Sequence, residues 1–278
     1  MRPEVVAVLV CPVCRASLTA GPGALRCSAG HTFDLARQGY VNLLAGLGRR
    51  PLGADDAAAV AARVDFLTAG HFAPLVAEIV SAAAAGWPGG LVLDVGSGPG
   101  HYLGAVLDAV PGALGLALDS SAAALRRAAR VHPRATALGW DLREPLPVRD
   151  EAAGVVLNVF APRNGSEYAR VLRRDGRLVV VVPGPGHLRE LVVGLGLIGV
   201  DAAKADRLAV SLHPWFQAVD EHHVGHRMQL TRDQVRAAVA MGPNAWHIGA
   251  DELAARVAQL PEVSAVSVEA SVRTYRRA

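Results

Sequence analysis

The segment LVLDVGSGPGHYLGAV, residues 91–106, limits the fold more than any other part of this chain. Its first five residues are almost continuously apolar, as expected of a strand covered on both faces. Gly96, Gly98 and Gly100 follow at once, and a helical pattern begins at His101. A buried strand, a glycine turn and a helix in this order allow a nucleotide-like ligand to approach the backbone at the carboxyl end of a parallel sheet.

The same alternation of strand and helix recurs along most of the chain and predicts a doubly wound, mostly parallel sheet. Helices are expected near 55–70 and 72–85, before the glycine segment. The sequence TRDQ, at 231–234, is a capping box that predicts the start of another helix. Further strands are predicted at 114–119, 135–141, 153–162 and 176–185, with a final antiparallel pair at 222–230 and 263–277.

All three cysteines of the chain lie in one window near its start, which a histidine closes. Cys11, Cys14, Cys27 and His31 have the spacing C-x2-C-x12-C-x3-H, which is typical of a structural zinc site. A Gly-Pro-Gly sequence between the two ligand pairs predicts a hairpin. About twenty residues cannot bury a core, so bound metal would supply the free energy of folding. The alternative, ordinary core cysteines beside an unrelated histidine, does not explain the clustering.

Composition sets further limits. The chain has 278 residues, of which 51% are hydrophobic and 19% charged, with a net charge of +3. These values predict a folded protein and permit an RNA partner without requiring one. An odd number of cysteines argues against a disulfide framework. No apolar run is long enough for a signal peptide or a membrane span, so a soluble, cytoplasmic protein without membrane contact is expected.

The ligand of the glycine loop can be narrowed. A dinucleotide site favours G-x-G-x-x-G, whereas this loop reads G-S-G-P-G, with His101 where the third glycine would stand. The loop resembles the cofactor loop of class I S-adenosylmethionine-dependent methyltransferases, in which an acidic residue such as Asp94 is also typical. A structural turn and a nicotinamide dinucleotide site are the alternatives.

Two further carboxylates follow the next strands. Asp119 ends the second strand, where it is placed to accept hydrogen bonds from both ribose hydroxyls of a bound nucleoside. Asp141 follows the third strand and could bond the adenine amino group, with Trp140 or Leu142 against the ring. A helix cap is the alternative role for Asp119, and a simple turn residue is the alternative for Asp141.

With a zinc knuckle followed by this sheet, the chain resembles the 23S rRNA (guanine-N1-)-methyltransferases over nearly its whole length. The segments that carry the resemblance are CPVC, FDLARQGYVNLL, LDVGSGPGHY, EYARVLRRDGRLVVVVPGPGHLREL and MGPNAWH. The resemblance implies a class I methyltransferase fold, Rossmann-like, with a mostly parallel seven-stranded sheet and a small N-terminal zinc-binding module. The implied cofactors are S-adenosylmethionine and Zn²⁺, and the implied reaction is methyl transfer to N1 of a guanosine in a 23S rRNA hairpin. Lys204 is the only lysine among 28 basic residues, and this composition favours the macrolide-resistance branch, of the tylosin type.

The resemblance also implies roles for individual residues. The four residues of the cysteine window are the zinc ligands. Phe72, where the family often has tyrosine, and His187 are cofactor neighbours, although a core aromatic and a helix-start residue are the respective alternatives. The implied cofactor-binding residues are Phe72, Asp94, Gly96, Gly98, Gly100, His101, Tyr102, Asp119, Asp141 and His187.

The same reading divides the chain into a zinc module at 1–36, a linker and helix at 37–70, and the methyltransferase domain at 71–278. The stretch 32–56 lacks sustained periodicity and is predicted to be a loop with a functional role. RNA contacts are expected from the zinc module and from surface arginines, each of which has a solvated face as its alternative. These arginines are Arg49, Arg50, Arg126, Arg127 and Arg130.

The catalytic base is left open. N1 of neutral guanine carries a proton that must leave, and the base must be flipped out of its stack to expose this edge. Asn158 follows the fourth strand and could orient the base, but an amide is a poor proton acceptor. Asp55 and Asp56 are the other candidates, with helix capping as their alternative role and solvent as an alternative acceptor.

Two other functions compete with rRNA methylation. One is a methyltransferase for a small molecule or lipid, which would share the sheet but rarely an N-terminal zinc knuckle. The other is a non-catalytic RNA-binding protein with a degenerate methyltransferase fold, against which the intact glycine loop argues. A homodimer is left as an alternative to a monomer.

Overall fold

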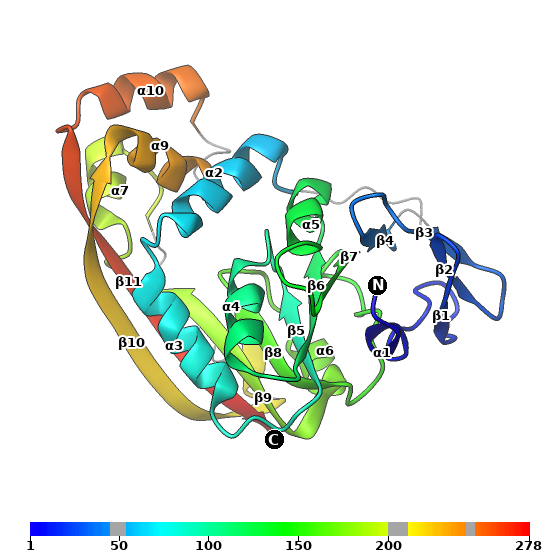
Figure 1. The fold of residues 1–278 in the computed structure, drawn as a ribbon. Coiled ribbons are helices and arrows are strands. Elements are labelled where there is room, and N and C mark those ends of the chain that lie inside the picture. The colour runs from blue at the N-terminus through cyan, green and yellow to red at the C-terminus, as the bar shows by residue number, and fades with distance from the viewer. Residues whose placement is uncertain (45–53, 200–210, 243–247) are drawn as a thin grey trace.

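The computed structural model describes residues 1–44, 54–199, 211–242 and 248–278. Arg49 and Arg50, and the NAWH part of the MGPNAWH segment, lie outside these residues. The chain forms a small N-terminal β-module beside a large α/β domain, and α7, α9 and α10 cluster at the opposite end of the molecule (Figure 1).

The N-terminal module is a three-stranded antiparallel sheet of β1 (Leu18–Gly21), β2 (Ala24–Cys27) and β3 (Thr32–Asp34), preceded by the short helix α1 (Pro3–Val6). The predicted hairpin between the two ligand pairs is the β1–β2 pair, joined by a tight turn.

The large sheet has the strand order β10-β11-β9-β8-β5-β6-β7-β4 within the described residues. Neighbours from β9 to β4 are parallel, and β11 and β10 are antiparallel, as predicted for the last pair. All seven strands expected from the sequence are present, and β4 is an eighth. The strands are β4 (Tyr40–Asn42), β5 (Leu91–Val95), β6 (Leu114–Asp119), β7 (Ala135–Gly139), β8 (Ala153–Val159), β9 (Leu172–Pro183), β10 (Phe216–Thr231) and β11 (Val263–Arg277).

The strand β4 corrects the expectation that residues 32–56 form a loop throughout. β3 and β4 both fall in this stretch, and β4 pairs in parallel with β7. Three-residue strands are too short to show a period of two, which is why the pattern missed them. The predicted boundary after residue 36 falls between a strand of the small sheet and a strand of the large one, so the two sheets follow each other closely along the chain.

The helices agree with the predicted positions, with two additions. The capping box at Thr231 and Gln234 is present and starts α9. The short α1 and α10 were not predicted, and α10 buries only Leu253 and Val257, which is a weak apolar stripe. The remaining helices are α2 (Ala57–Thr68), α3 (Ala73–Ala84), α4 (His101–Ala109), α5 (Ala122–Ala128), α6 (Gly165–Val171), α7 (Arg189–Leu195), α9 (Arg232–Ala240) and α10 (Ala250–Ala258).

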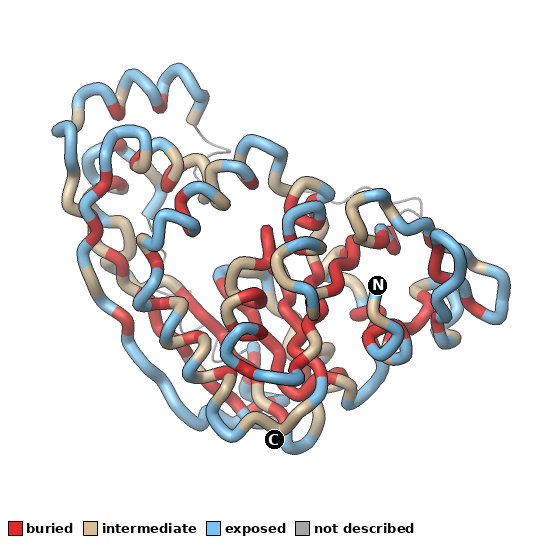
Figure 2. Tube along the Cα trace, viewed as in Figure 1, coloured by how far each residue is buried: buried red, intermediate tan, exposed pale blue. Residues whose placement is uncertain are grey.

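Apolar side chains cover both faces of the sheet, and the strands at its centre are buried along their length (Figure 2). One core cluster contains Val92, and the other contains Leu93, so successive residues of β5 point to opposite faces. The second cluster also includes Leu9, Leu25 and Phe33 of the N-terminal module. The module therefore packs against the catalytic sheet and shares its core.

Within the described ranges, no single helix is long and apolar enough to cross a membrane. The helices α2 and α3 meet the criterion of length and composition only when taken together, across an 87° bend.

Candidate functional site

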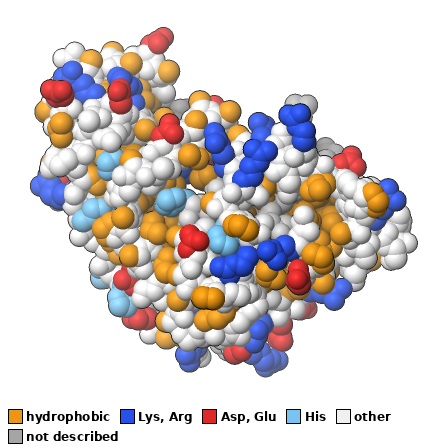
Figure 3. Space-filling view, viewed as in Figure 1, with side chains coloured by type: hydrophobic (Ala, Val, Ile, Leu, Met, Phe, Trp, Pro, Cys, Tyr) orange, Lys and Arg blue, Asp and Glu red, His pale blue; other side chains and the backbone are white. Residues whose placement is uncertain are grey.

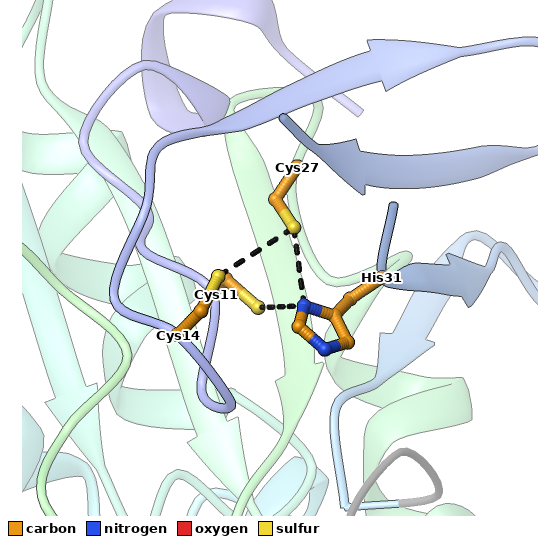
Figure 4. Close-up of side chains that lie close together, drawn as sticks. All are labelled: Cys11, Cys14, Cys27 and His31. Carbon is orange, nitrogen blue, oxygen red and sulfur yellow. Dashed lines mark hydrogen bonds between the residues drawn. The ribbon is translucent and has the colours of Figure 1, made fainter. Parts of the chain in front are cut away.

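The four residues of the cysteine window converge on one point (Figure 4). The Nδ1 atom of His31 lies 3.6 Å from the Cys11 sulfur and 3.3 Å from the Cys27 sulfur. The sulfurs of Cys14 and Cys27 are 3.7 Å apart. A tetrahedral zinc ion with ordinary bond lengths would space its sulfur and nitrogen ligands by about 3.5–3.8 Å. Both the donor set and the spacing fit Zn²⁺, as predicted.

Local backbone turns aim these ligands. The N–H of Arg15 donates to the carbonyl of Cys11, and the N–H of Gly30 donates to the carbonyl of Cys27. Burial raises the pKa of the Cys27 thiol, but hydrogen bonding with His31 outweighs this and lowers it to about 6. Four protein ligands leave no open position for a substrate, so the centre is structural.

Glycine is required in the loop after β5 for two different reasons. Gly96 has φ of +83°, and a Cβ there would lie 2.4 Å from the Cβ of Ala161, across the cavity described below. Gly100 also has φ of +83°, but a Cβ there would lie 3.1 Å from the Cα of Ala128 on α5. Gly96 therefore opens the ligand site, whereas Gly100 permits close packing of α4 against α5.

Asp119 holds this loop in place. Its two carboxylate oxygens accept hydrogen bonds from the N–H of Gly98 and the N–H of Ser121, each at 2.8 Å. Burial raises the pKa of Asp119, and these two hydrogen bonds oppose that effect. The carboxylate thus fixes the β5 turn to the β6 turn, where the predicted ribose would bind.

Asp141 forms a bidentate ion pair with Arg143, with N–O distances of 2.9 and 2.7 Å. Leu142 lines the cavity next to it. Trp140 is only 2% exposed and belongs to the core under the sheet. Of the two side chains expected against an adenine ring, the structure places Leu142 at the site and Trp140 away from it.

Asp94 is a buried carboxyl group, 1% exposed, two residues before Gly96. Its Oδ2 atom has no hydrogen-bond partner among the described residues. Burial, and secondarily the charge of Asp119, raises the pKa of Asp94 to about 8. In the ligand-free protein this group therefore remains largely protonated at neutral pH.

A cavity of about 1060 Å³ opens above the loop, at the carboxyl ends of the parallel strands. A smaller cavity of about 330 Å³ adjoins it on the β6–β7 side and contains Asp119 and Asp141 in its wall. Asp94 and Gly100 are in neither lining. The predicted residues that line the main cavity are Asp55, Phe72, Gly96, Gly98, His101, Tyr102 and His187.

Arg63 of α2 is a site residue that the sequence analysis missed. It forms an ion pair with Asp55 and donates to the carbonyl of Met241. Its guanidinium lies over the glycine loop, because a Cβ on Gly98 would be 3.5 Å from the Arg63 Nη1. Both members of the pair line both cavities. No motif marks Arg63 in the sequence, since only the fold brings α2 over the loop.

The other candidate catalytic residues have structural contacts. Asn158 is completely buried, and its Nδ2 donates to the carbonyl of Pro162 at 2.9 Å. It supports the loop after β8 from below and does not line either cavity, so it does not face a substrate in this structure. Asp56 accepts from the N–H of Ala59 at 2.8 Å and is the N-cap of α2.

An aromatic wall closes the main cavity. The ring of His187 lies 5.9 Å from that of Phe72 and 5.7 Å from that of Phe160. The N–H of Glu269 donates to the Nδ1 of His187 at 3.3 Å, which leaves the proton of the neutral ring on Nε2. Burial lowers the pKa of His187 to about 4, so the ring is uncharged at neutral pH.

Lys and Arg side chains are spread across the centre of the face shown in Figure 3, between the helical end and the N-terminal module. Arg126, Arg127 and Arg130, the predicted RNA contacts that the structure describes, are all exposed. Their exposure is compatible with a phosphate-binding role and with a solvated surface.

The fold and the site together define a class I S-adenosylmethionine-dependent methyltransferase. A solved structure titled "Complex between the Haloferax volcanii Trm112 methyltransferase activator and the putative methyltransferase" matches 80% of this chain and 97% of its own, with a TM-score of 0.50 and 16% identity. This likeness concerns the fold alone. A zinc-ribbon family model described as "RlmA, N-terminal" matches residues 9–46.

Two relatives match over 99% of both chains. They are a Micromonospora griseorubida protein named "Putative 23S rRNA (guanine-N(1)-)-methyltransferase", 50% identical, and a Streptomyces fradiae 23S rRNA (guanine(748)-N(1))-methyltransferase, 48% identical. The chain belongs to the family of 23S rRNA (guanine-N1-)-methyltransferases. This confirms the resemblance found in the sequence.

Removing one zinc ligand tests the metal centre. The variant Cys27→Ser should lose the bound zinc, and because the module shares a core with the sheet, the melting temperature should fall by about 5–10 °C. Zinc content is measured by plasma mass spectrometry and unfolding by calorimetry. Val13→Ala, an exposed change between the first two ligands, is the matched control. Zinc-free wild-type protein, or a Cys27→Ser variant with full zinc content, would contradict the assignment.

The buried carboxyl group predicts a pH dependence of stability. The pKa of Asp94 rises from 3.8 to about 8 on folding, so the folded protein binds this proton more tightly. The free energy of unfolding should therefore fall as the pH rises from about 4 to about 8. Asp94→Asn should remove much of this fall, as measured by urea denaturation at pH 5 and pH 8.5 without cofactor.

The exposed variant Asp108→Asn serves as the control for this experiment and should follow the wild type. An equal loss of stability in the wild type and in Asp94→Asn would show that the Asp94 carboxyl group does not titrate as described.

Proposed function

We propose that this protein transfers a methyl group from S-adenosylmethionine to N1 of a guanosine in a hairpin of 23S rRNA. The observation that carries the proposal is identity of 48–50% over the full length of two guanine-N1 methyltransferases, zinc module included. The relative from Streptomyces fradiae is named for guanosine 748, and we propose the corresponding guanosine here. Macrolide resistance of the tylosin type is the proposed physiological role, and the cytoplasm, where ribosomes are assembled, is the proposed location.

The site residues support a division of the cofactor between the two cavities. We assign the adenosine to the smaller cavity, where Asp119 and Asp141 face the bound nucleoside and Leu142 flanks the base. The methionine end then extends over Gly96 towards His101 and Tyr102 in the main cavity. The space that a Cβ on Gly96 would fill, and the unpartnered Asp94 carboxyl group below, fit a ligand that carries positive charge.

S-adenosylmethionine supplies a methyl group already activated by its sulfonium, so the protein contributes mainly position. The loop after β8, held from below by Asn158, borders the space where the acceptor base would meet the methyl group. The N1 proton has two candidate acceptors. Asp55 lines the cavity but is paired with Arg63, and solvent is the other.

The small-molecule and non-catalytic alternatives receive less support. The loop and both carboxylates required for cofactor binding are intact, and the zinc module matches a family model along with the catalytic domain's full-length relatives. A hairpin as the recognised form of RNA, and a homodimer as the assembly, remain predictions.

Methyl transfer from tritiated cofactor tests the proposal. The purified protein should label deproteinised 23S rRNA and not a metabolite or lipid extract. Primer extension on the product should stop at one guanosine, because a methyl group on N1 blocks base pairing. Label in the extract, or labelled rRNA without a stop at a guanosine, would contradict the proposal.

The variant Asp119→Ala tests the cofactor site separately. It removes the acceptor of two backbone hydrogen bonds and the proposed ribose contact, so the Kd for S-adenosylhomocysteine should rise at least about tenfold, or 1.4 kcal/mol. Affinity is measured by titration calorimetry. Asp175→Ala, an exposed change on β9, is the control. Unchanged affinity in Asp119→Ala would refute the role of this carboxylate.

A further inference from the structure

The main cavity has room for more than the cofactor. Pockets that hold one small molecule usually measure about 300–1,000 Å³. This cavity measures about 1060 Å³, and the adjoining one adds about 330 Å³. If the adenosine occupies the smaller cavity, most of the larger one is left for a second ligand. The wall of that remaining space should show what the ligand is.

Phe160 is the most unusual residue in this wall. It directly follows β8 and borders both cavities. Its side chain is 39% exposed, although it is large and apolar. Its φ of +53° is a left-handed conformation that a residue with a Cβ adopts at a cost. Strained backbone of this kind is retained where it positions a functional side chain.

The surroundings of Phe160 are suited to a flat aromatic ligand. The Phe160 ring is tilted by 38° against that of His187 at 5.7 Å, so it keeps a face towards the open space. His187 in turn contacts Phe72 from behind. The platform is therefore supported from one side only. Stacking on an aromatic side chain is a common way for proteins to bind an unpaired base.

Two donors accompany this platform. The Nε2 of His187 carries its proton, because Nδ1 accepts from the N–H of Glu269. Arg163 lies three residues after Phe160 and lines the same cavity. Its Nε is buried and unpartnered, and the structure pairs its guanidinium with no carboxylate among the described residues. A half-buried cation without an ion pair is costly, and a ligand that accepts hydrogen bonds would compensate for it.

We propose that Phe160 is the platform on which the flipped guanine stacks, and that Arg163 and His187 donate to acceptor atoms of that nucleotide. This deepens the proposed function, on which it rests, by naming the acceptor subsite. Guanine presents acceptors at O6 and N7, whereas adenine replaces O6 with an amino donor. Two donors beside the platform therefore favour guanine over adenine. Contacts at O6 and N7 also leave N1 free for methylation.

Binding of a mononucleotide tests the subsite without the reaction. Saturation-transfer NMR with guanosine 5′-monophosphate, in the presence of S-adenosylhomocysteine, should give a strong signal for the wild type. Phe160→Ala should reduce this signal at least fivefold, and Phe160→Tyr should retain it. Adenosine 5′-monophosphate should give a signal at least threefold weaker. A wild type without signal, a Phe160→Ala variant equal to the wild type, or equal signals for the two nucleotides would overturn the inference.

Methylation kinetics provide the second readout. For 23S rRNA, kcat/KM should fall at least tenfold in Phe160→Ala and in Arg163→Gln, while the Kd for S-adenosylhomocysteine changes less than threefold. Val219→Ala and Arg174→Gln, both exposed and outside the cavities, should behave as the wild type. An equal loss of cofactor affinity and of kcat/KM would assign Phe160 to the cofactor and overturn the inference.

The two proposals fail in different ways. A wild type that does not methylate 23S rRNA contradicts the proposed function, and the mononucleotide result then still decides whether Phe160 forms a purine subsite. A wild type that methylates 23S rRNA, together with a Phe160→Ala variant of equal kcat/KM, contradicts only the subsite.

Discussion

The carboxylate of Asp119 accepts hydrogen bonds from the turns that end two neighbouring strands, and the arrangement of the site depends on this contact. By holding the N–H of Gly98 and the N–H of Ser121, it sets the opening between β5 and β6 at the edge of the sheet. The two cavities meet across that opening. Carboxylates that accept backbone hydrogen bonds are stabilised in their charged form, so one buried group both shapes the loop and presents negative charge to a ligand. The sheet below provides rigidity, since its central strands are buried on both faces.

The second organising feature is the sharing of one core between the zinc module and the catalytic sheet. Leu9, Leu25 and Phe33 pack with residues of the main domain. The metal therefore orders a segment that is also part of the large domain's hydrophobic core. Three-residue β4, next along the chain, adds itself to the edge of the large sheet. RNA bound by the module would be held at a fixed position relative to the cavity.

Much of this could be predicted from the sequence, where the signal was local. Continuous apolar runs located the strands, the capping box located α9, and the C-x2-C-x12-C-x3-H spacing located the metal ligands. Arg63 and Phe160 could not be found in this way, because their roles come from the packing of α2 and of the loop after β8 around one cavity. Asn158 was expected to face the substrate because of its place after β8, but its side chain points into the protein and bonds to Pro162. Strand alternation identified the end of β8 without showing which side chain there faces the cavity.

The most direct measurement is a crystal structure of the protein with S-adenosylhomocysteine bound. The account predicts the adenosine in the smaller cavity with its ribose on Asp119, the amino-acid end beside His101, and open space above the ring of Phe160. An adenosine in the main cavity against Phe160, or a ligand that leaves the carboxylate of Asp119 without contact, would contradict the account.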